Sequence, residues 1–410
     1  MAMVLLRAPA SLREHGVLNM SVSTGMHEAI PLSLYIHYPW CVRKCPYCDF
    51  NSHSSEGEIP EQTYLDALLA DLEQHLGEIW GRRIDTIFIG GGTPSLISPE
   101  GMDFLLTQLR VRLPIRPDIE ITMEANPGTI EQGRFAAFRQ AGINRLSIGI
   151  QSFDDDKLRA LGRVHDGRQA RAAIASAQQA GFDNLNLDLM FGLPGQDANG
   201  AVADLEQAIN AGAPHLSWYQ LTIEPNTAFA HRPPSLPDED QLWAIQCEGE
   251  ASLSAAGFTQ YEISAWSQAG SRCRHNMNYW QFADYLGIGA GAHGKLTRMD
   301  TQSVSRHWKQ RHPQRYMETA AGPDVLAGSR QLDQGDLLLE FMMNALRLEQ
   351  GFSQMLFEQR TGLSLEYAAA ALQKACDRGL LIWQGDQIRP SEMGRRHLNQ
   401  LLAYFMPEEE

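Results

Sequence analysis

The sequence has few cysteines and no long apolar run, and these two absences exclude whole classes of protein. Six cysteines among 410 residues are too few for a disulfide framework, and the N-terminal residues make a poor signal peptide. No apolar stretch approaches the roughly 20 residues that span a bilayer. We therefore expect a cytoplasmic protein, and the sequence leaves open whether it contacts a membrane peripherally.

Positive charge is also scarce. The chain has 34 Lys and Arg residues against 49 Asp and Glu residues, a formal net charge of -15. Nucleic-acid binding needs a basic surface, so no nucleic-acid partner is expected. The hydrophobic fraction of 43% is nevertheless enough to bury a large core. This length and composition predict one large domain with one or two smaller ones.

Short apolar runs alternate with helical patterns through the first half of the chain. Six of these runs have strand character, namely residues 32–37, 85–89, 120–124, 145–150, 185–190 and 216–221. Strands that alternate with helices predict βα units around a parallel sheet, and six units favour a partial (β/α)6 barrel over a flat sheet. Chemistry in such α/β barrels lies at the carboxyl ends of the strands. The polar residues at those ends are therefore site candidates.

The sequence pattern divides the chain into four segments. Residues 1–28 are interpreted as a flexible leader, 29–230 as the partial barrel, 231–325 as a barrel extension and 326–410 as a C-terminal domain. Helical patterns and a short hairpin in the last segment predict a smaller helical, winged-helix-like unit. Because the chain is acidic, we expect this unit to cover the barrel or recruit a partner protein rather than bind DNA.

Three of the six cysteines form the loop Cys41-x3-Cys45-x2-Cys48. Three thiolates leave one iron of a four-iron cluster free to bind an exchangeable ligand. A structural zinc site would need a fourth ligand, and only His53 lies nearby in sequence. The spacing resembles the radical S-adenosylmethionine (SAM) signature, in which SAM chelates the open iron. Two isolated cysteines in helical patterns are expected to be ordinary buried thiols: Cys247 and Cys376.

A glycine run follows the second predicted strand, in Gly90-Gly91-Gly92-Thr93-Pro94. Without side chains, this backbone can approach a ligand closely. The Gly-Lys-Ser/Thr ending of a phosphate-binding Walker loop is absent. A glycine run is by itself more often a turn, but here it follows the cysteine loop by one βα unit. Glu124 and Gln151, at later strand ends, are either ligand contacts or ordinary barrel-mouth residues.

These motifs in order resemble the oxygen-independent coproporphyrinogen III oxidase (HemN) superfamily. The resemblance covers roughly residues 30 to 300. It rests on Tyr35-Ile-His-Tyr-Pro-Trp-Cys41 through Phe50, GGGTP, MEANPGT, GIQSF, Leu161-Gly-Arg163-x-His165 and Asp188-Leu-Met-Phe-Gly-Leu-Pro194-Gly. It implies a partial barrel with a [4Fe-4S] cluster on Cys41, Cys45 and Cys48 and SAM across the mouth. The SAM contacts it implies are Tyr35, Tyr47, Gly91, Gly92, Thr93, Glu124, Gln151, Arg163 and Asp188.

Two features distinguish the branches of this superfamily. The oxidase branch carries a further cysteine two residues after the third cluster ligand, and here that position is Phe50. Downstream, the run from Cys273 to Trp280 contains His-Asn-Met-Asn-Tyr-Trp and resembles the HNxxYW motif of HemW-type haem chaperones. The resemblance implies that His275 is an axial haem ligand. Asn276 would orient its imidazole. The alternatives are a packed structural histidine and ligation by the Cys273 thiolate.

The sequence therefore predicts a haem chaperone with three cofactors or ligands: a [4Fe-4S] cluster, SAM and haem. It would transfer haem to acceptor apo-haemoproteins such as respiratory enzymes. The rival hypothesis is a radical SAM oxidase that decarboxylates coproporphyrinogen III or a related substrate. The sequence leaves open the acceptor, the use of SAM cleavage, and whether the chain forms a homodimer.

Overall fold

The computed structural model of the chain describes residues 30–55, 57–128 and 133–406. The predicted leader at 1–28 lies outside the described residues. A twelve-stranded sheet dominates the fold, in the order β14-β13-β12-β11-β1-β4-β5-β6-β7-β8-β10-β9. No helix among the described residues is long and apolar enough to cross a membrane.

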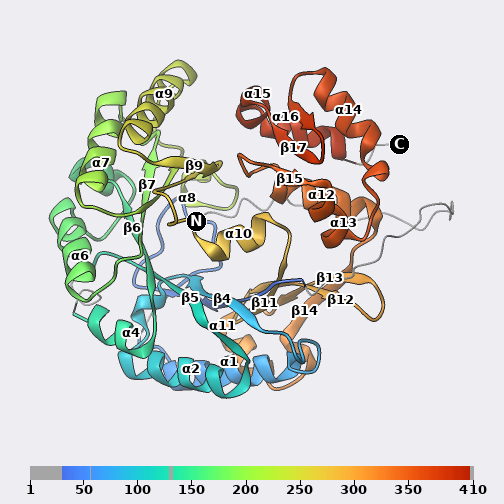
Figure 1. Ribbon diagram of the computed structural model, residues 1–410. Coiled ribbons are helices and arrows are strands. Elements are labelled where there is room, and N and C mark those ends of the chain that lie inside the picture. Colours follow the sequence, from blue (N-terminus) through green and yellow to red (C-terminus); the bar gives the residue numbers. More distant parts are fainter. Residues whose placement is uncertain (1–29, 56, 129–132, 407–410) are drawn as a thin grey trace.

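Six consecutive strands of this sheet run parallel and form the partial barrel. They are β1 (Leu32–Tyr38), β4 (Ile84–Gly91), β5 (Ile115–Ala125), β6 (Arg145–Gln151), β7 (Leu185–Phe191) and β8 (His215–Gln220). The connecting helices form an arc outside the strands (Figure 1): α1 (Glu61–His75), α2 (Pro99–Arg112), α4 (Phe135–Ala141), α5 (Asp155–Ala160), α6 (Gly167–Gln179) and α7 (Ala198–Asn210). Strand β7 is buried along its whole length, as expected when both faces of a parallel sheet are covered. The predicted partial barrel of six βα units is confirmed.

Both edges of the parallel sheet are extended. On one side β11 (Asp284–Ile288) pairs parallel to β1, and three antiparallel strands follow: β12 (His293–Arg298), β13 (Ser303–Lys309) and β14 (Leu326–Gln331). On the other side lie β10 (Ala265–Ser267) and β9 (Thr259–Glu262). The helices of this part are α8 (Ala228–His231), α9 (Glu239–Ala255), α10 (Arg274–Trp280) and α11 (Pro313–Thr319).

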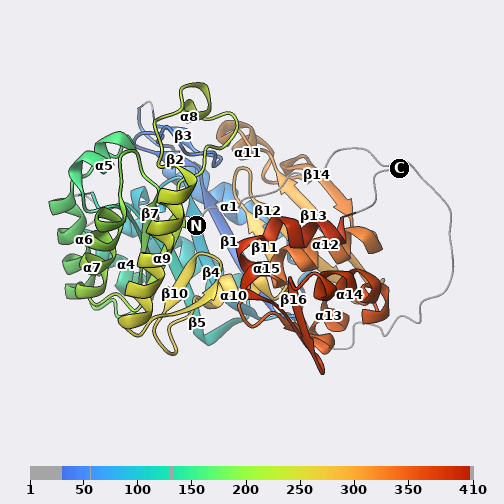
Figure 2. The same ribbon diagram turned by 90° about the horizontal axis from the view of Figure 1, so that it is seen from above.

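Two small features mark the ends of the barrel. Strands β2 (Trp40–Cys41) and β3 (His53–Ser54) pair parallel and hold the cysteine loop. Figure 2 shows this pair at one end of the barrel, whereas α10 lies toward the other end. In Figure 1, α10 lies inside the arc of strands. The cysteine loop and the HNxxYW segment are therefore on different levels of the barrel.

The C-terminal unit has its own core and confirms the predicted helical, winged-helix-like fold. Its elements are α12 (Gln334–Ala345), β15 (Phe352–Ser353), α13 (Gln354–Thr361), α14 (Ala369–Asp377), β16 (Leu381–Gln384), β17 (Gln387–Pro390), α15 (Glu392–Arg396) and α16 (Leu398–Leu402). Phe341 packs edge-to-face on Phe352 and Phe357, with ring centroids 4.9 and 5.0 Å apart. Since β14 still belongs to the large sheet, the sheet runs past the boundary expected after residue 325. The domain division itself stays a prediction.

Candidate functional site

The three loop cysteines lie together at the carboxyl end of β1. The backbone N–H of Cys48 donates to the carbonyl of Cys45 at 3.1 Å, which closes a turn between these two thiols. Arg163 Nη1 lies 3.6 Å from Cys45 Sγ, and Ser52 Oγ lies 3.8 Å from Cys48 Sγ. Burial raises the pKa of Cys41, and the Thr93 hydroxyl opposes this by stabilising the thiolate. Donors directed at sulfur suit thiolates that hold an iron–sulfur cluster.

Residues without side chains are required in the glycine run because its backbone lies very close to the start of the cysteine loop. Gly92 N donates to the Tyr38 carbonyl and Thr93 N to the Trp40 carbonyl, both at 2.7 Å. Gly91 has a φ of +119°, and its N–H donates to Glu124 Oε2 at 3.0 Å. These N–H groups are thus occupied by protein oxygens. The glycine run fixes the position of the cysteine loop, whatever ligand it also contacts.

Replacing Gly92 with alanine is expected to displace the cysteine loop. A Cβ at this position would lie 2.5 Å from the Trp40 carbonyl oxygen, which belongs to backbone that cannot easily move. We expect a loss of about 1–3 kcal/mol in the free energy of unfolding, as for other overpacked sites. Urea unfolding of the apo-protein measures this loss, and iron content after reconstitution should fall with it. Gly77→Ala is the matched control, since no atom lies within 4 Å of its Cβ position. Equal stability of the two variants would contradict the steric argument.

Two carboxylates face the interior beside this loop. Burial raises the pKa of Glu124, and the nearby Asp188 carboxylate raises it further. Asp188 on β7 accepts hydrogen bonds from Ser147 Oγ at 3.0 Å and Asn186 Nδ2 at 2.8 Å. Tyr35 on β1 also interacts electrostatically with Glu124, and its hydroxyl is hydrogen-bonded to His37 Nδ1 at 2.9 Å. Paired, partly desolvated carboxylates suit a ligand that carries positive charge.

Arg163 joins the cysteine loop to the ends of two strands. Its Nη2 donates to Asn126 Oδ1 at 2.6 Å and to the Gly149 carbonyl at 2.8 Å. Burial alone would lower the pKa of Arg163, but Tyr47 and Cys45 raise it by favouring the cation. Gln151 ends β6 with a φ of 67°, and its Oε1 accepts from Tyr219 at 2.8 Å. Backbone strain of this kind is often found at functional sites.

The structure thus brings the sequence-predicted SAM residues near one another, with Tyr35 and Asp188 in the middle of their strands and the others at or beyond strand ends. Sequence reasoning missed Asn126 and Tyr219, which lie in or beside this group. Asn126 also donates to Thr93 Oγ1 at 3.0 Å. Both follow the rule that selected Glu124 and Gln151, because they are polar residues at or just after a strand end. The same rule applied to every strand would have found them.

His275 on α10 is buried within the barrel, with 2% of its surface exposed. Its Nδ1 is hydrogen-bonded to Thr86 Oγ1 at 2.8 Å, and Thr86 is bonded in turn to Ser33 Oγ at 2.7 Å. Its buried Nε2 has no hydrogen-bond partner among the described residues. Burial lowers the pKa of His275 to about 3, so the imidazole is neutral at pH 7. The side chain that orients the ring is therefore Thr86, whereas the sequence suggested Asn276.

The other cysteines differ from expectation. Cys273 is fully buried, and burial raises its pKa to about 12, so it stays a protonated thiol and fits poorly as a thiolate ligand. Cys247 was expected to be buried but is exposed on α9, and Cys376 is half-buried. A helical pattern locates a residue on a helix, but the face it occupies depends on how that helix packs. The prediction of buried thiols was wrong for Cys247.

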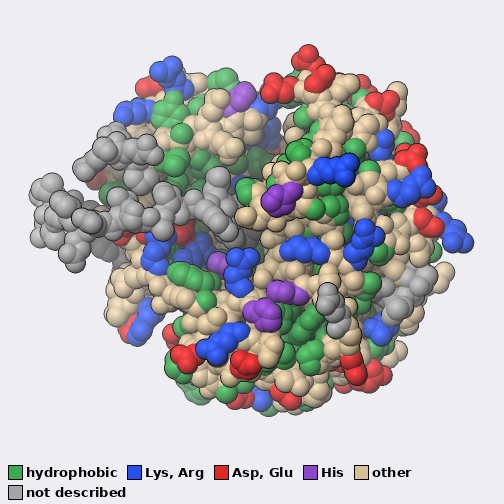
Figure 3. Space-filling view, turned by 180° about the vertical axis from the view of Figure 1, so that it is seen from behind, with side chains coloured by type: hydrophobic (Ala, Val, Ile, Leu, Met, Phe, Trp, Pro, Cys, Tyr) green, Lys and Arg blue, Asp and Glu red, His purple; other side chains and the backbone are tan. Residues whose placement is uncertain are grey.

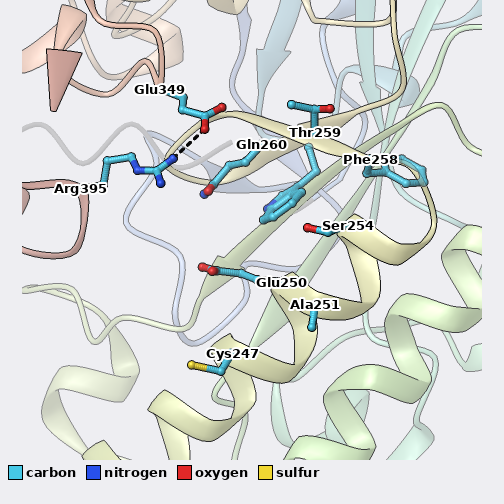
Figure 4. A pocket seen from close by; sticks show the side chains of 10 residues that line it. Cys247, Glu250, Ala251, Ser254, Phe258, Thr259, Gln260, Glu349 and Arg395 are labelled. Atoms are coloured by element: carbon cyan, nitrogen blue, oxygen red, sulfur yellow. Dashed lines mark ion pairs between the residues drawn. The ribbon is translucent and has the colours of Figure 1, made fainter. Parts of the chain in front are cut away.

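This group of residues coincides neither with a single-ion metal site among the described residues nor with the surface pocket between α9 and the C-terminal unit. Among the described residues, no three His, Cys, Asp or Glu side chains gather around one point that would suit a metal ion. Thiolates on a four-iron cluster bind separate iron atoms, so that observation does not test such a cluster. A surface pocket of about 540 Å³ lies elsewhere, between α9, β9 and the C-terminal unit (Figure 4). Glu349 and Arg395, 3.1 Å apart, form an ion pair on its C-terminal side.

Comparison with known proteins identifies the family. Residues 35–208 match the Radical SAM superfamily, and residues 332–397 match the HemN C-terminal domain. Over 378 residues the chain is 49% identical to the heme chaperone HemW of Escherichia coli (strain K12), covering 92% of this chain and 99% of that protein. The chain belongs to the HemW family. Membership of the radical SAM superfamily implies a [4Fe-4S] cluster and SAM, and the predicted family is confirmed.

Further relatives agree with this assignment. The heme chaperone HemW of Haemophilus influenzae (strain ATCC 51907 / DSM 11121 / KW20 / Rd) is 48% identical over 388 residues, covering 94% of this chain and all of that protein. The solved structure of coproporphyrinogen III oxidase (HemN) from Escherichia coli matches with a TM-score of 0.78 at 23% identity. It covers 93% of this chain and 92% of that one. At this identity, the likeness to HemN shows a shared fold.

Proposed function

We propose that this protein is a haem chaperone that takes up haem and transfers it to acceptor haem proteins, including respiratory enzymes. In this proposal Cys41, Cys45 and Cys48 hold a [4Fe-4S] cluster, and His275 is an axial ligand for haem iron. The proposal places the protein in the cytoplasm. Its SAM contacts are the residues predicted from the sequence: Tyr35, Tyr47, Gly91, Gly92, Thr93, Glu124, Gln151, Arg163 and Asp188.

The observation that carries the haem proposal is the state of the His275 imidazole. Its Nδ1 is fixed by Thr86 while its Nε2 is buried without a partner. If Nδ1–H donates to Thr86, the Nε2 lone pair is free and already oriented, as metal-binding histidines require. An unpaired polar atom in a core carries a free-energy cost, and a ligand on Nε2 would remove it. Because the ring is buried, haem reaches Nε2 only after side chains packed around it, such as Phe88 and Tyr279, move aside.

The cofactor residues have separate tasks in this proposal. When bound, the cluster and SAM supply one-electron chemistry at the end of the barrel. Glu124 and Asp188 attract the positively charged sulfonium and ammonium groups of SAM. Arg163 donates a hydrogen bond toward Cys45 Sγ, and hydrogen bonds to cluster sulfurs tune the cluster potential.

The test compares two activities of the anaerobically reconstituted full-length protein. Haem uptake and its transfer to an apo-haemoprotein are followed by absorption spectroscopy, and coproporphyrinogen III oxidation is assayed in parallel. We expect stoichiometric haem uptake and transfer without oxidase turnover. In His275→Ala, haem should be retained at least about 10- to 100-fold more weakly, because that range applies to losing a supporting contact and His275 would be a direct ligand. The exposed His231 supplies the matched control, His231→Ala.

Two results would count against the proposal. Robust oxidase turnover by the wild-type protein would replace the chaperone function with the radical-enzyme alternative. Unchanged haem retention in His275→Ala would leave the chaperone function in place and refute only the ligand assignment.

A further inference from the structure

A second histidine presents its ring to solvent beside the barrel mouth. His293 begins β12, is exposed, and pairs across the sheet with Trp308 on β13. The two rings are stacked at 26°, with centroids 6.4 Å apart. Gly328 on β14 is the next cross-strand neighbour of Trp308, and a Cβ there would collide with the indole ring. The sheet is thus built to let Trp308 lie flat and support the His293 imidazole.

The strand that carries Trp308 also carries contacts that lead toward His275. Arg306 lies two residues before Trp308 on the same face of β13, and its guanidinium contacts the Tyr285 ring and pairs with Glu340 on α12. Tyr285 packs on Tyr279 of α10 at 4.3 Å between ring centroids. Tyr279 in turn contacts His275 at 5.1 Å. Ring contacts therefore lead from Arg306, whose charge acts on His293, through Tyr285 and Tyr279 to buried His275.

The same pair is also tied to the cysteine loop. Asn51 Nδ2 donates to the Ala290 carbonyl at 2.9 Å and to the Arg311 carbonyl at 2.8 Å. Ala290 precedes β12 and Arg311 follows β13, so one amide bridges these two antiparallel strands at the same end. The Asn51 carbonyl meets His37 Nε2 at 2.9 Å, and His37 is bonded to Tyr35 at the predicted SAM site. Hydrogen bonds thus connect strands β12 and β13, which carry His293 and Trp308, to the predicted SAM site.

The charges around His293 suit an anionic ligand. Packing of protein atoms around the ring, together with the nearby charges of Arg306 and Arg311, lowers the pKa of His293. The imidazole is therefore neutral near pH 7, the form that binds iron. Arg311 is exposed. Figure 3 shows one face of the molecule on which histidine side chains lie among lysine and arginine side chains, although the chain as a whole is acidic.

We propose that His293 is the entry ligand for haem, which binds its iron at the barrel mouth before haem reaches buried His275. Trp308 acts as a positioning residue, because a ring stacked on the imidazole keeps its plane fixed. Arg311 pairs with a haem propionate, since a guanidinium binds a carboxylate in forked geometry. The inference rests on the proposed function. Because His275 is buried, haem would first need an exposed ligand, and His293 supplies it.

The test follows the kinetics of haem uptake by the reconstituted full-length protein in a stopped-flow spectrometer. We expect an early coordinated species in the wild type and its loss in His293→Ala, with uptake slowed about tenfold or more. His275→Ala should keep the early species and lose the final one. Iron-free protoporphyrin IX has no metal to ligate, so its binding should be the same in wild type and His293→Ala. His231→Ala is the control for removing an exposed histidine.

A second variant tests the role of the indole without touching the ligand. Gly328→Ala should displace Trp308 and slow haem uptake, while Gly322→Ala, with no atom within 4 Å of its Cβ position, should not. Uptake by His293→Ala at the wild-type rate and with the wild-type early spectrum would overturn the inference while leaving the chaperone proposal intact. No haem uptake by the wild type would instead refute the chaperone proposal, and this inference with it.

Discussion

Cys45→Ala is expected to abolish cluster assembly. An iron–sulfur cluster held by three thiolates has no spare protein ligand, so losing one leaves two irons unprotected. Weakening an outer contact of a metal site already costs about 10- to 100-fold in affinity, and removing a direct ligand should cost at least that much. Cys45 is also the thiol approached by Arg163 at 3.6 Å. Iron and acid-labile sulfide analysis after anaerobic reconstitution measures the loss.

The chain supplies matched controls for this experiment. Cys247 and Cys376 lie on helices outside the loop, so Cys247→Ala and Cys376→Ala should keep the wild-type iron content. Arg163→Leu keeps all three thiols and removes the donor to Cys45, so it should retain a cluster with a shifted reduction potential. Wild-type iron content in Cys45→Ala would mean that the cluster is held by other residues.

Asp71→Ala is expected to lower the free energy of unfolding by about 3–5 kcal/mol, as when one partner of a buried ion pair is removed. Asp71 on α1 and Lys309 on β13 are both fully buried and form an ion pair. The Asp71 carboxylate also accepts from Tyr316 Oη at 2.8 Å and Gly289 N at 3.2 Å. Without it, the Lys309 ammonium would be buried without its direct ion-pair partner. Urea unfolding of the apo-protein at pH 7 gives the difference.

Two further variants separate this charge effect from a general loss of packing. The double variant Asp71→Leu with Lys309→Met removes both charges and should recover most of the lost stability, because apolar replacement of a whole buried pair is often neutral. Glu73 on the same helix pairs with Arg112 at 2.8 Å but is half-exposed, so Glu73→Ala should change stability little. A double variant as unstable as Asp71→Ala would mean that the carboxylate's hydrogen bonds, rather than charge balance, hold this site together.

The sequence was most informative where chemistry depends on local order. The cysteine spacing, the glycine run and the polar strand ends are each set by a few consecutive residues. Six strand patterns were enough to predict the partial barrel, because alternating βα units have few ways to pack. His275 was also selected as a candidate haem ligand from its local motif. Its burial was not predicted, since exposure depends on how α10 packs inside the arc of strands.

The remaining features come from contacts between residues far apart in the chain. Thr86 meets His275 across 189 positions, and Asn51 reaches Ala290 and Arg311 across 239 and 260 positions. No periodicity or spacing records such pairs, because they depend on strand order and register in the folded sheet. The sequence by itself thus determined the family and the barrel, and it predicted the cluster ligands. Only the tertiary structure decided that His275 is buried and that His293 is exposed beside the Trp308 ring. It also decided that Asn51 links strands β12 and β13 to the cysteine loop.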